Sequence, residues 1–399
     1  MNLKPALRES PRRSERPEDR DKGLGALAGP RICRKKLMDR YPLLEIDGKI
    51  IRRNAEILLG ECRRNGVEPF AVLKGFNALP GIRDVLVKAG YKTLASSRLP
   101  HLAAVKEAGL AVETLGLRLP MLSEVHEVVR VCDISLNSEP ETLRALDRAA
   151  GAADLFHKVI LMRDLGDLRE GIFEGDRFIE TALYVERELK NLCLYGVGVN
   201  LTCYGSVIPT EKNLSELAAN AADIEKLIGR KLAVVSGGNT TSLPLLLRGA
   251  MPEGINNLRI GEAIVVPCDL AGQWRCPVEG LSNRGLVLKA EIIEIGRKPT
   301  HPIGELGTNC FGSHSHYEDR GVRRRALLAL GAFDIGDPEK LIPDDPRIKI
   351  LGASSDHMII DIEESENDYR LGDVVSFTLH YQAMLFATEN PLIKKRYVS

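Results

Sequence analysis

The chain has 399 residues, more than one hydrophobic core usually supports, so two folded domains are expected. Its 55 basic and 55 acidic residues give a formal net charge of zero, which excludes a whole-chain attraction to nucleic acid or to an anionic membrane. A small neutral or zwitterionic molecule suits this charge balance better as a partner.

The eight cysteines are spread singly along the chain, and no two of them have the Cys-x-x-Cys spacing of a zinc or redox site. Reduced thiols of this kind are typical of the cytoplasm. No apolar run is long enough to span a bilayer, and residues 1–37 lack the apolar segment of a secretory signal. We therefore expect a cytoplasmic protein that has neither a membrane nor a nucleic acid as its partner.

Residues 1–37 are rich in arginine, proline and glycine and contain almost no periodic apolar residues. Such a segment cannot bury enough apolar surface to offset the conformational entropy that ordering would cost. We predict that residues 1–37 form a disordered extension.

From Leu43 to about Cys268, short apolar runs alternate with amphipathic stretches of helical period, which is typical of βα units around a parallel sheet. The pattern predicts strands at 69–73, 93–95, 112–117, 134–136, 158–162, 194–199, 232–235 and 257–260. Helices are predicted at 47–65, 80–89, 99–108, 123–131, 140–150, 175–189, 213–228 and 241–249. Since eight parallel strands close a barrel, we predict an α/β fold, a (β/α)8 TIM barrel, in residues 38–268.

After about Cys268 the pattern changes to alternating polar and apolar residues separated by glycine and proline turns. Strands are predicted at 285–295, 324–330, 349–351, 357–362 and 373–381. This pattern predicts a C-terminal antiparallel β-domain in residues 269–399.

Lys74 ends the first predicted strand of the barrel, in the apolar run Phe70–Gly75. Chemistry in this fold gathers at the carboxyl ends of the strands. Burial and neighbouring cations lower the pKa of a lysine in such a place and make its amine nucleophilic. The alternative is a lysine whose charged head simply reaches solvent.

The seventh predicted strand leads through Ser236–Ser242 into a helix, so backbone amides and hydroxyls meet the positive end of a helix dipole. The eighth strand ends in the segment Arg259–Glu262. Loops after the seventh and eighth strands are the usual phosphate site of this fold. We predict an anion site that includes Ser236 and Asn239, although an ordinary turn is the alternative for so short a motif.

These segments, taken in order, resemble the alanine racemase superfamily of fold type III, and specifically the predicted amino-acid racemases typified by ornithine racemase. The resemblance covers residues 43–385. The matching segments are 44–47 with Asn54, 71–74, 164–171, 198–205, 236–242, 259–262, 352–357 and Tyr381.

The resemblance implies pyridoxal 5′-phosphate as the cofactor, held by Lys74 as a Schiff base. It further implies that Thr240 and Gly261 bind the phosphate together with the backbone amide of Glu262. Tyr381 matches a residue that adds a hydroxyl contact to the phosphate.

Three further positions are implied to contact the cofactor ring. Arg259 matches an arginine that faces the pyridine nitrogen, and Arg169 one near the phenolic oxygen. Thr202 stands where alanine racemases often place a histidine beneath the ring. An arginine does not give up its proton, so it does not protonate the pyridine as an acid would, and the weaker electron sink suits racemisation. The alternative for Arg259 is an ordinary ion pair with an acid on a neighbouring loop.

Racemisation needs proton-transfer groups on both faces of the planar carbanion, and Lys74 serves only one of them. Alanine racemases take the other group, a tyrosine, from the partner's β-domain, but the matching segment Leu330–Asp334 has none. Tyr317 and Asp356 are our candidates, with a structural role as the alternative for each. The resemblance thus implies a homodimer with shared active sites. No metal site is predicted, because His314 and His316 have no further ligands.

We therefore predict an amino-acid racemase that interconverts L and D forms, with ornithine as the favoured substrate. The acceptors considered for the distal ammonium group of ornithine are Asp164, Asp167, Glu170 and Glu305. A basic amino-acid decarboxylase of the same fold type is one alternative, disfavoured by Arg259 and by the short β-domain. A non-catalytic carrier of pyridoxal phosphate is the other, disfavoured because such single-barrel proteins lack a C-terminal domain.

Overall fold

The computed structural model describes residues 40–312, 314 and 316–398. The predicted extension, residues 1–37, lies outside the described residues. No helix in the described ranges combines the length and the apolar character needed to cross a membrane.

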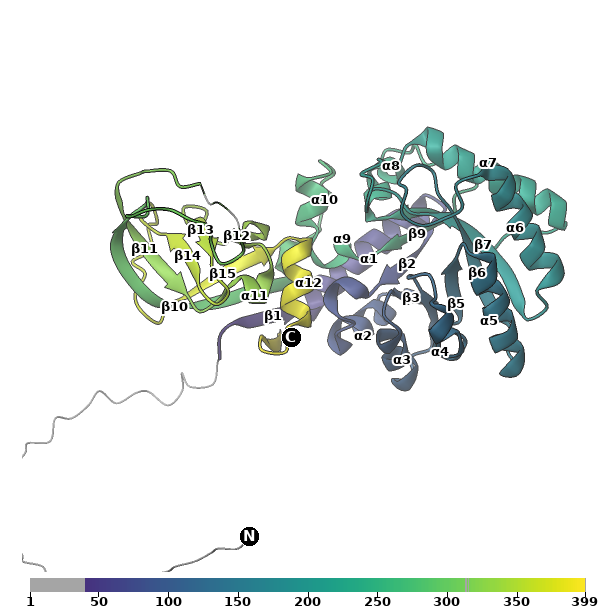
Figure 1. Ribbon diagram of the computed structural model, residues 1–399, viewed down its shortest axis with the longest axis horizontal. Helices are drawn as coiled ribbons and strands as arrows, with labels where there is room; N and C mark the ends of the chain where they lie inside the picture. Colours follow the sequence, from purple (N-terminus) through teal and green to yellow (C-terminus); the bar gives the residue numbers. More distant parts are fainter. Residues whose placement is uncertain (1–39, 313, 315, 399) are drawn as a thin grey trace, which may run out of the picture. The chain divides into compact units, whose positions relative to one another are not determined.

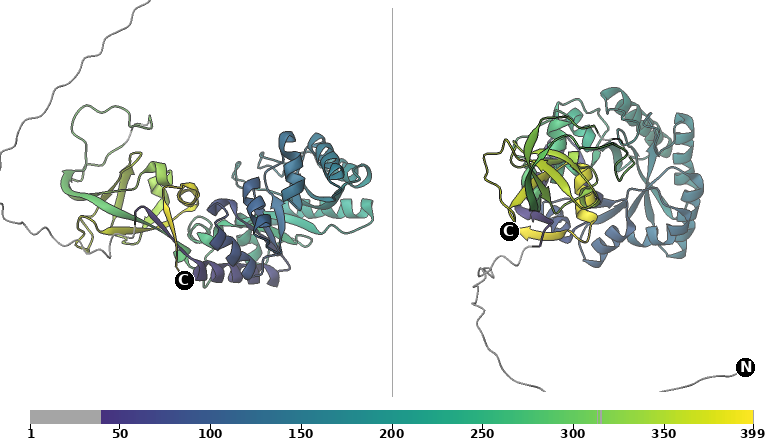
Figure 2. Two further views of the ribbon diagram at one scale, coloured as in Figure 1. Left: turned by 90° about the horizontal axis from the view of Figure 1, so that it is seen from below. Right: turned by 60° about the vertical axis from the view of Figure 1, so that its left-hand side comes forward.

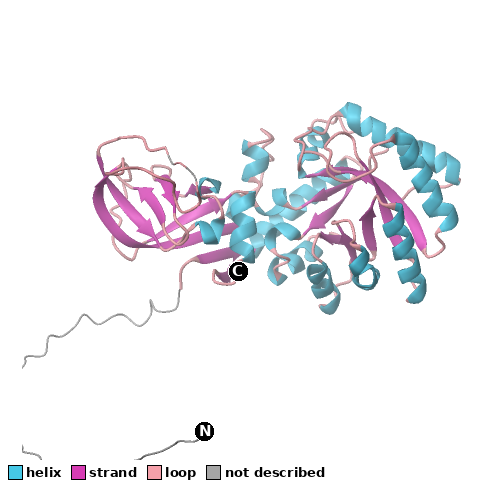
Figure 3. Cartoon of the chain, viewed as in Figure 1, coloured by secondary structure: helices cyan, strands magenta, loops and turns pink. Residues whose placement is uncertain are grey.

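Strands β2 to β9 are parallel and close into a barrel, in which β9 pairs with β2 (Figures 1 and 3). The strands are β2 Glu68–Val72, β3 Thr93–Ser96, β4 Glu113–Gly116, β5 Ile134–Asn137, β6 His157–Arg163, β7 Leu192–Val199, β8 Val234–Asn239 and β9 Asn257–Ile260. Each predicted barrel strand overlaps one of them, so the prediction of the barrel is confirmed. Buried side chains from alternate strand positions, such as Phe70, Leu136 and Met162, form one cluster inside the barrel.

Helices pack on the outside of the barrel, as Figure 2 shows. They are α1 Gly48–Arg64, α2 Pro80–Lys88, α3 Leu99–Glu107, α4 Val125–Val131, α5 Pro140–Ala152, α6 Gly175–Glu188, α7 Glu211–Ile228 and α8 Leu243–Leu247. Two short helices follow β9, α9 Glu262–Val265 and α10 Cys268–Gly272. Single 3₁₀ turns are η2 Lys74–Phe76, η3 Leu122–Glu124, η4 Thr240–Ser242, η5 Asn283–Gly285 and η6 Pro338–Lys340.

A second sheet follows the barrel, with the strand order β12-β15-β10-β11-β14-β13 (Figure 1). Its strands are β10 Leu286–Pro299, β11 Val322–Leu328, β12 Leu341–Pro343, β13 Lys349–Ala353, β14 Met358–Asp361 and β15 Val374–Leu379. All the pairs along this path are antiparallel. The predicted antiparallel β-domain is therefore present. The short helix α11, Ala332–Ile335, follows β11.

Strand β1, Leu43–Asp47, differs from the expectation that residues 38–268 belong to the barrel. It pairs antiparallel with β10 and parallel with β16, Lys394–Val398, and so lies in the second sheet. A short apolar strand carries no periodicity that shows which sheet it joins. One continuous core of buried side chains extends from Leu44 in β1 through Ala71 in β2 to Phe377 in β15.

The predicted strand 373–381 also ends differently. Strand β15 stops at Leu379, and Tyr381 begins helix α12, Tyr381–Glu389, which packs against η2. A Cβ atom on Gly75 would lie 2.8 Å from the Met384 Cε atom, so a larger residue at this position would displace the end of the Met384 side chain. The Thr388 hydroxyl also donates a hydrogen bond of 3.3 Å to the Gly75 carbonyl.

Asn54 joins α1 to the segments that follow the barrel. Its side chain is fully buried, and its Nδ2 atom donates to the carbonyls of Ile264, at 3.0 Å, and Ser282, at 2.9 Å. Its Oδ1 atom accepts the Ser282 amide at 2.9 Å. All the polar atoms of this amide group are therefore used, and the contacts connect residues far apart in the sequence.

We expect Asn54→Ala to lower the free energy of unfolding by about 2 to 3 kcal/mol, because three backbone groups lose their partner. Asn65→Ala is the control, since this exposed side chain, directly after the same helix, makes one hydrogen bond, to the Glu61 carbonyl. The control substitution should change the free energy of unfolding by less than about 0.5 kcal/mol. Urea unfolding followed by circular dichroism measures both, and equal midpoints for the two variants would contradict the prediction.

Candidate active site

A cavity of about 780 Å³ lies at the carboxyl ends of the barrel strands. It is large enough for a cofactor and a small substrate. The predicted site residues that line it are Lys74, Arg169, Thr202, Asn239, Thr240, Arg259, Gly261, Glu262 and Tyr381. The fold therefore brings these nine residues of the prediction to one place.

Lys74 is the first residue of η2 and lies directly beyond β2 in the wall of the cavity. Burial lowers the pKa of its amine, and the positive charges of Arg169 and Arg259 lower it further. The charges of Cys203 and Glu170 oppose this shift. The net effect makes the neutral, nucleophilic amine more abundant at neutral pH than in an ordinary lysine.

Arg259 is the buried cation of the cavity, with 4% of its surface exposed. Its guanidinium donates to the Ser236 hydroxyl at 2.5 Å and to the Val199 carbonyl at 2.8 Å. Burial lowers the pKa of Arg259 to about 10, which still leaves it protonated at neutral pH. Within the described residues no carboxylate forms an ion pair with Arg259, so the expected alternative of an ordinary ion pair is not what the structure shows.

Ser236 differs from its predicted role as a cofactor contact. It is fully buried behind Arg259, and its hydroxyl donates to the Asn257 Oδ1 atom at 2.6 Å. Ser236 therefore orients the guanidinium and does not line the cavity. Adjacent residues on β8 face opposite sides of the strand. The sequence motif alone does not show which of them faces the cavity.

The turn after β8 and the turn after β9 bring small groups and backbone together. Asn239 accepts the Thr241 amide at 2.9 Å and donates to the Leu201 carbonyl at 3.0 Å. A Cβ atom on Gly261 would lie 2.6 Å from the Val72 carbonyl oxygen, so only glycine allows this approach of β9 to β2. These turns occupy the usual phosphate position of a β/α barrel.

Asn200 adds a donor to the same cavity. Its Nδ2 atom is buried and has no hydrogen-bond partner among the described residues. Orphaned buried donors are rare in folded proteins and indicate an absent acceptor. Together with the charges of Arg169 and Arg259 and the hydroxyls of Thr240 and Tyr381, it fits an anionic cofactor.

Two loops beside the cavity are held by hydrogen bonds from their backbone amides to carboxylates. Asp167 accepts the amides of Thr202 at 2.9 Å and Tyr204 at 3.1 Å. Thr202 has a φ of 78°, a strained left-handed conformation that this contact supports. Asp164 accepts the Gly166 amide at 2.9 Å. Both carboxylates therefore act as acceptors for backbone amides of these loops.

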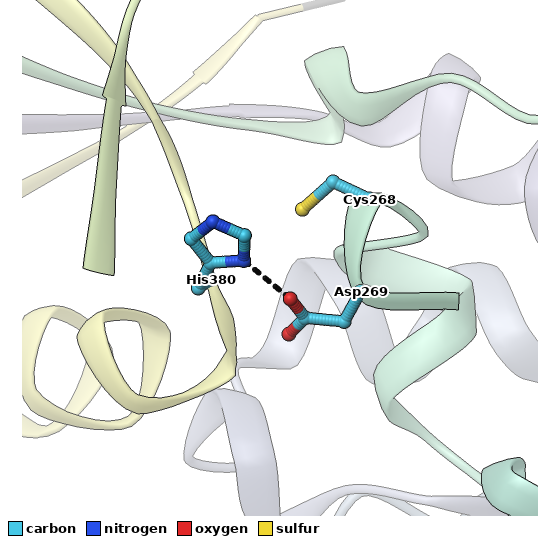
Figure 4. A group of neighbouring side chains, drawn as sticks. All are labelled: Cys268, Asp269 and His380. Atoms are coloured by element: carbon cyan, nitrogen blue, oxygen red, sulfur yellow. Dashed lines mark hydrogen bonds and ion pairs between the residues drawn. The ribbon is translucent and has the colours of Figure 1, made fainter. Parts of the chain in front are cut away.

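Asp269 is a site residue that the sequence analysis missed. It is fully buried on α10 and accepts a hydrogen bond from His380 Nδ1 (Figure 4). It also accepts the Tyr381 amide at 2.8 Å and Gln273 Nε2 at 2.9 Å. Glu262 also hydrogen-bonds to it. The signal available in the sequence was one aspartate in the otherwise apolar run Val265–Leu270.

Cys268, Asp269 and His380 offer ligand atoms within 4.8 Å of one another, as a metal site would (Figure 4). The Asp269 oxygens, however, already accept several hydrogen bonds. Burial raises the pKa of the Cys268 thiol to about 12, and the thiol donates to the Leu379 carbonyl at 3.4 Å. These contacts favour a hydrogen-bonded connection between α10 and α12 over a metal site.

Tyr317 and Asp356 do not line the cavity of their own chain. Tyr317 lies between β10 and β11 and stacks edge-on with His301, with 6.2 Å between the ring centroids. Asp356 is exposed in the turn between β13 and β14 and accepts the Ser355 hydroxyl at 2.7 Å. Glu305, an expected acceptor for the substrate, is likewise exposed and outside the cavity.

Comparisons with known proteins show which proteins this chain resembles. The family model described as alanine racemase, N-terminal domain, matches residues 46–267. The ornithine racemase of Acetoanaerobium sticklandii is 41% identical over 355 residues, which cover 89% of this chain and 99% of that protein. The lysine racemase of Thermotoga maritima is 37% identical over 357 residues, covering 90% and 98%. The alanine racemase structure from Streptomyces lavendulae has a TM-score of 0.68 at 17% identity, covering 90% of this chain and 97% of that one, and shares the fold.

The lowered pKa of Lys74 predicts its reactivity. In protein freed of small molecules, acylation of Lys74 by acetic anhydride should show an inflection below the ordinary lysine value of 10.5, because only the neutral amine reacts. Each unit of lowering raises the neutral fraction at neutral pH about tenfold. Arg169→Gln removes a positive charge and should move the inflection upward. Mass spectrometry of the labelled peptide measures both, and an inflection at or above 10.5 in the unmodified sequence would disprove the prediction.

Proposed function

The chain belongs to the alanine racemase family and is an amino-acid racemase, and we propose that it depends on pyridoxal 5′-phosphate and interconverts L- and D-ornithine. The observation that carries this proposal is Lys74, whose amine lies in the cavity wall with a lowered pKa near Arg169 and Arg259. The identity to an ornithine racemase supports the choice of substrate.

The cavity residues fit this cofactor. Lys74 would hold it covalently, and the hydroxyls of Thr240 and Tyr381 would contact its phosphate with the backbone of Gly261 and Glu262. When bound, pyridoxal phosphate supplies an electron sink that stabilises negative charge at the Cα atom of an amino acid.

The remaining predicted contacts are Arg259 at the pyridine nitrogen, Arg169 at the phenolic oxygen, Thr202 beneath the ring and Asn239 in the anion site. Arg259 is held from behind by Ser236, so its free face is available to the cavity. Because it keeps its proton, it limits protonation of the ring nitrogen, and this favours return of a proton to Cα over decarboxylation.

A second proton-transfer group must act on the face opposite Lys74. We propose that it is Tyr317 or Asp356 from a second copy of the chain, in a homodimer with shared active sites. The segment that carries Tyr317 also exposes apolar side chains, with Ile303 90% and Phe311 55% exposed. Uncovered apolar side chains of this kind are typical of surfaces that bind a partner.

We further propose that the enzyme acts in the cytoplasm. The cysteines of the described ranges, such as Cys62 and Cys268, are free thiols. Free thiols persist in the reducing cytoplasm.

The function is tested by incubating the enzyme and cofactor with single enantiomers of ornithine, lysine and alanine and following the loss of circular dichroism. Ornithine should racemise fastest. Lys74→Ala should lower the rate at least about 1000-fold, because the general base is lost. Lys92→Ala, which removes an exposed lysine, should not. Borohydride reduction should attach the cofactor to Lys74, and an adduct on another lysine would contradict the assignment.

The shared site is tested by mixing two inactive variants, Lys74→Ala and Tyr317→Phe, and allowing their subunits to exchange. Heterodimers contain one intact site, so random exchange should restore on the order of a quarter of the wild-type activity. Asp356→Asn replaces Tyr317→Phe in a parallel mixture. Exchange demonstrated by mass spectrometry without recovery in either mixture would refute a site shared through these residues.

A further inference from the structure

Glu262 and Asp269, the acidic pair, line the active-site cavity beside Lys74 and Tyr381. We propose that the acidic pair is the acceptor for the distal ammonium group of a diamino-acid substrate. This inference rests on the proposed function, because it concerns how the same cavity selects ornithine or lysine over a neutral amino acid of equal length.

The other carboxylates considered for this role are already engaged. Glu170 lines the cavity but forms a two-point ion pair with Arg169. Asp164 and Asp167 accept backbone amides of the mouth loops. In the acidic pair, Asp269 is hydrogen-bonded to His380, Gln273 and the Tyr381 amide, but neither carboxylate forms an ion pair with lysine or arginine in the described part of the chain.

The position of the acidic pair makes a charge contact strong. Asp269 is fully buried and Glu262 is half-buried, so water screens them little. Asp269 accepts hydrogen bonds from His380 (Figure 4), from Gln273 and from the amide of Tyr381. The carboxylate is thus preorganised, and binding an ammonium group requires little rearrangement.

A second observation indicates a ligand in the same cavity. The Asn200 side chain is 8% exposed, and its Nδ2 donor has no partner in the described ranges. An orphaned donor fits an anionic group of a ligand, whereas the acidic pair fits a cationic group. A diamino acid bound with the cofactor supplies both charges.

The two carboxyls of the acidic pair also influence each other's protonation. Burial raises the pKa of Glu262 to about 8, and the charge of Asp269 and the hydrogen bond between the two carboxyls contribute. The groups that face the acidic pair are Lys74 from η2, Cys268 and Gln273 from α10, and His380 and Tyr381 from α12. The positive charge of Lys74 opposes the shift.

The sign of the pH dependence follows. At neutral pH Glu262 keeps its proton and can donate it to Asp269. An ammonium group supplies protons in its place, so binding favours ionised Glu262 and releases that proton. The KM for ornithine should therefore fall as the pH rises toward about 8.

The test compares ornithine with norvaline, which has the same chain length without the distal ammonium group. In Glu262→Gln the KM for ornithine should rise about 10- to 100-fold, the range for a hydrogen bond to a charged group. The change in kcat should be smaller, and the ratio of kcat/KM values for ornithine and norvaline should fall by the same factor. Glu253→Gln removes an exposed carboxylate outside the cavity and should keep the wild-type ratio.

Binding is measured separately by calorimetry on the holoenzyme with α-methylornithine, which has no Cα proton to lose, and with α-methylnorvaline. At neutral pH the wild type should bind α-methylornithine more tightly and release about one more proton, as buffers of different ionisation enthalpy reveal. Glu262→Gln should lose both differences. Asp269→Asn should weaken binding of α-methylornithine in the same direction, which provides a second variant if one fails to fold.

The results of these experiments distinguish a failure of this inference from a failure of the proposed function. If the wild type racemises ornithine but Glu262→Gln keeps the ornithine preference and the proton release, this inference is wrong and the proposed function stands. If the wild type racemises norvaline but neither ornithine nor lysine, the proposed substrate and the inference fail together.

Discussion

Helix α12 packs closely on η2, with the Met384 and Tyr381 side chains against Gly75, and this contact supports the preceding residue, Lys74, in the cavity wall. The contact is reinforced by the Thr388 hydroxyl on the Gly75 carbonyl and by the buried side chain of Met384. The first residue of the same helix, Tyr381, lines the cavity. One helix of the C-terminal part therefore both supports the lysine and contributes a side chain to the cavity wall.

The cavity is lined by several charged side chains that are wholly or partly buried. The cavity holds Lys74, Arg259 and the acidic pair in surroundings of low polarity, and each group is stabilised differently. Arg259 has neutral acceptors, Ser236 and Val199, whereas Asp269 has neutral and imidazole donors. Because Lys74 and Arg259 form no ion pair with a carboxylate in the described part of the chain, their charges remain available to a charged group of a ligand.

The barrel could be predicted from the sequence because each strand is an apolar run between helices of clear period, and eight such units have one common closed arrangement. The residues at the strand ends followed from the fold and from the family resemblance. What could not be predicted depends on long-range pairing. Strand β1 joins the second sheet, and the segment after Leu379 turns into a helix, for reasons that lie in partners far away in the chain.

Several features of the site also depend on long-range contacts that the sequence pattern does not reveal. Ser236 was expected at the cofactor, but its side chain lies on the side of β8 that contacts Arg259. Asp269 was missed because a lone acid after the barrel has no motif, and its importance appears only when α12 approaches it. Tyr317 and Asp356 were inferred for a partner's site, and a single chain places neither at its own cavity.

The dependence of η2 on α12 also has a consequence for biosynthesis. A ribosome makes Lys74 early, and the barrel strands emerge soon afterwards, but the helix that covers the lysine is translated long after them. While the chain is growing, the nascent barrel presents an uncovered turn at Lys74, without Tyr381 and without the donors that hold Asp269. Lys74 therefore acquires the neighbours that α12 supplies only after translation has passed that helix.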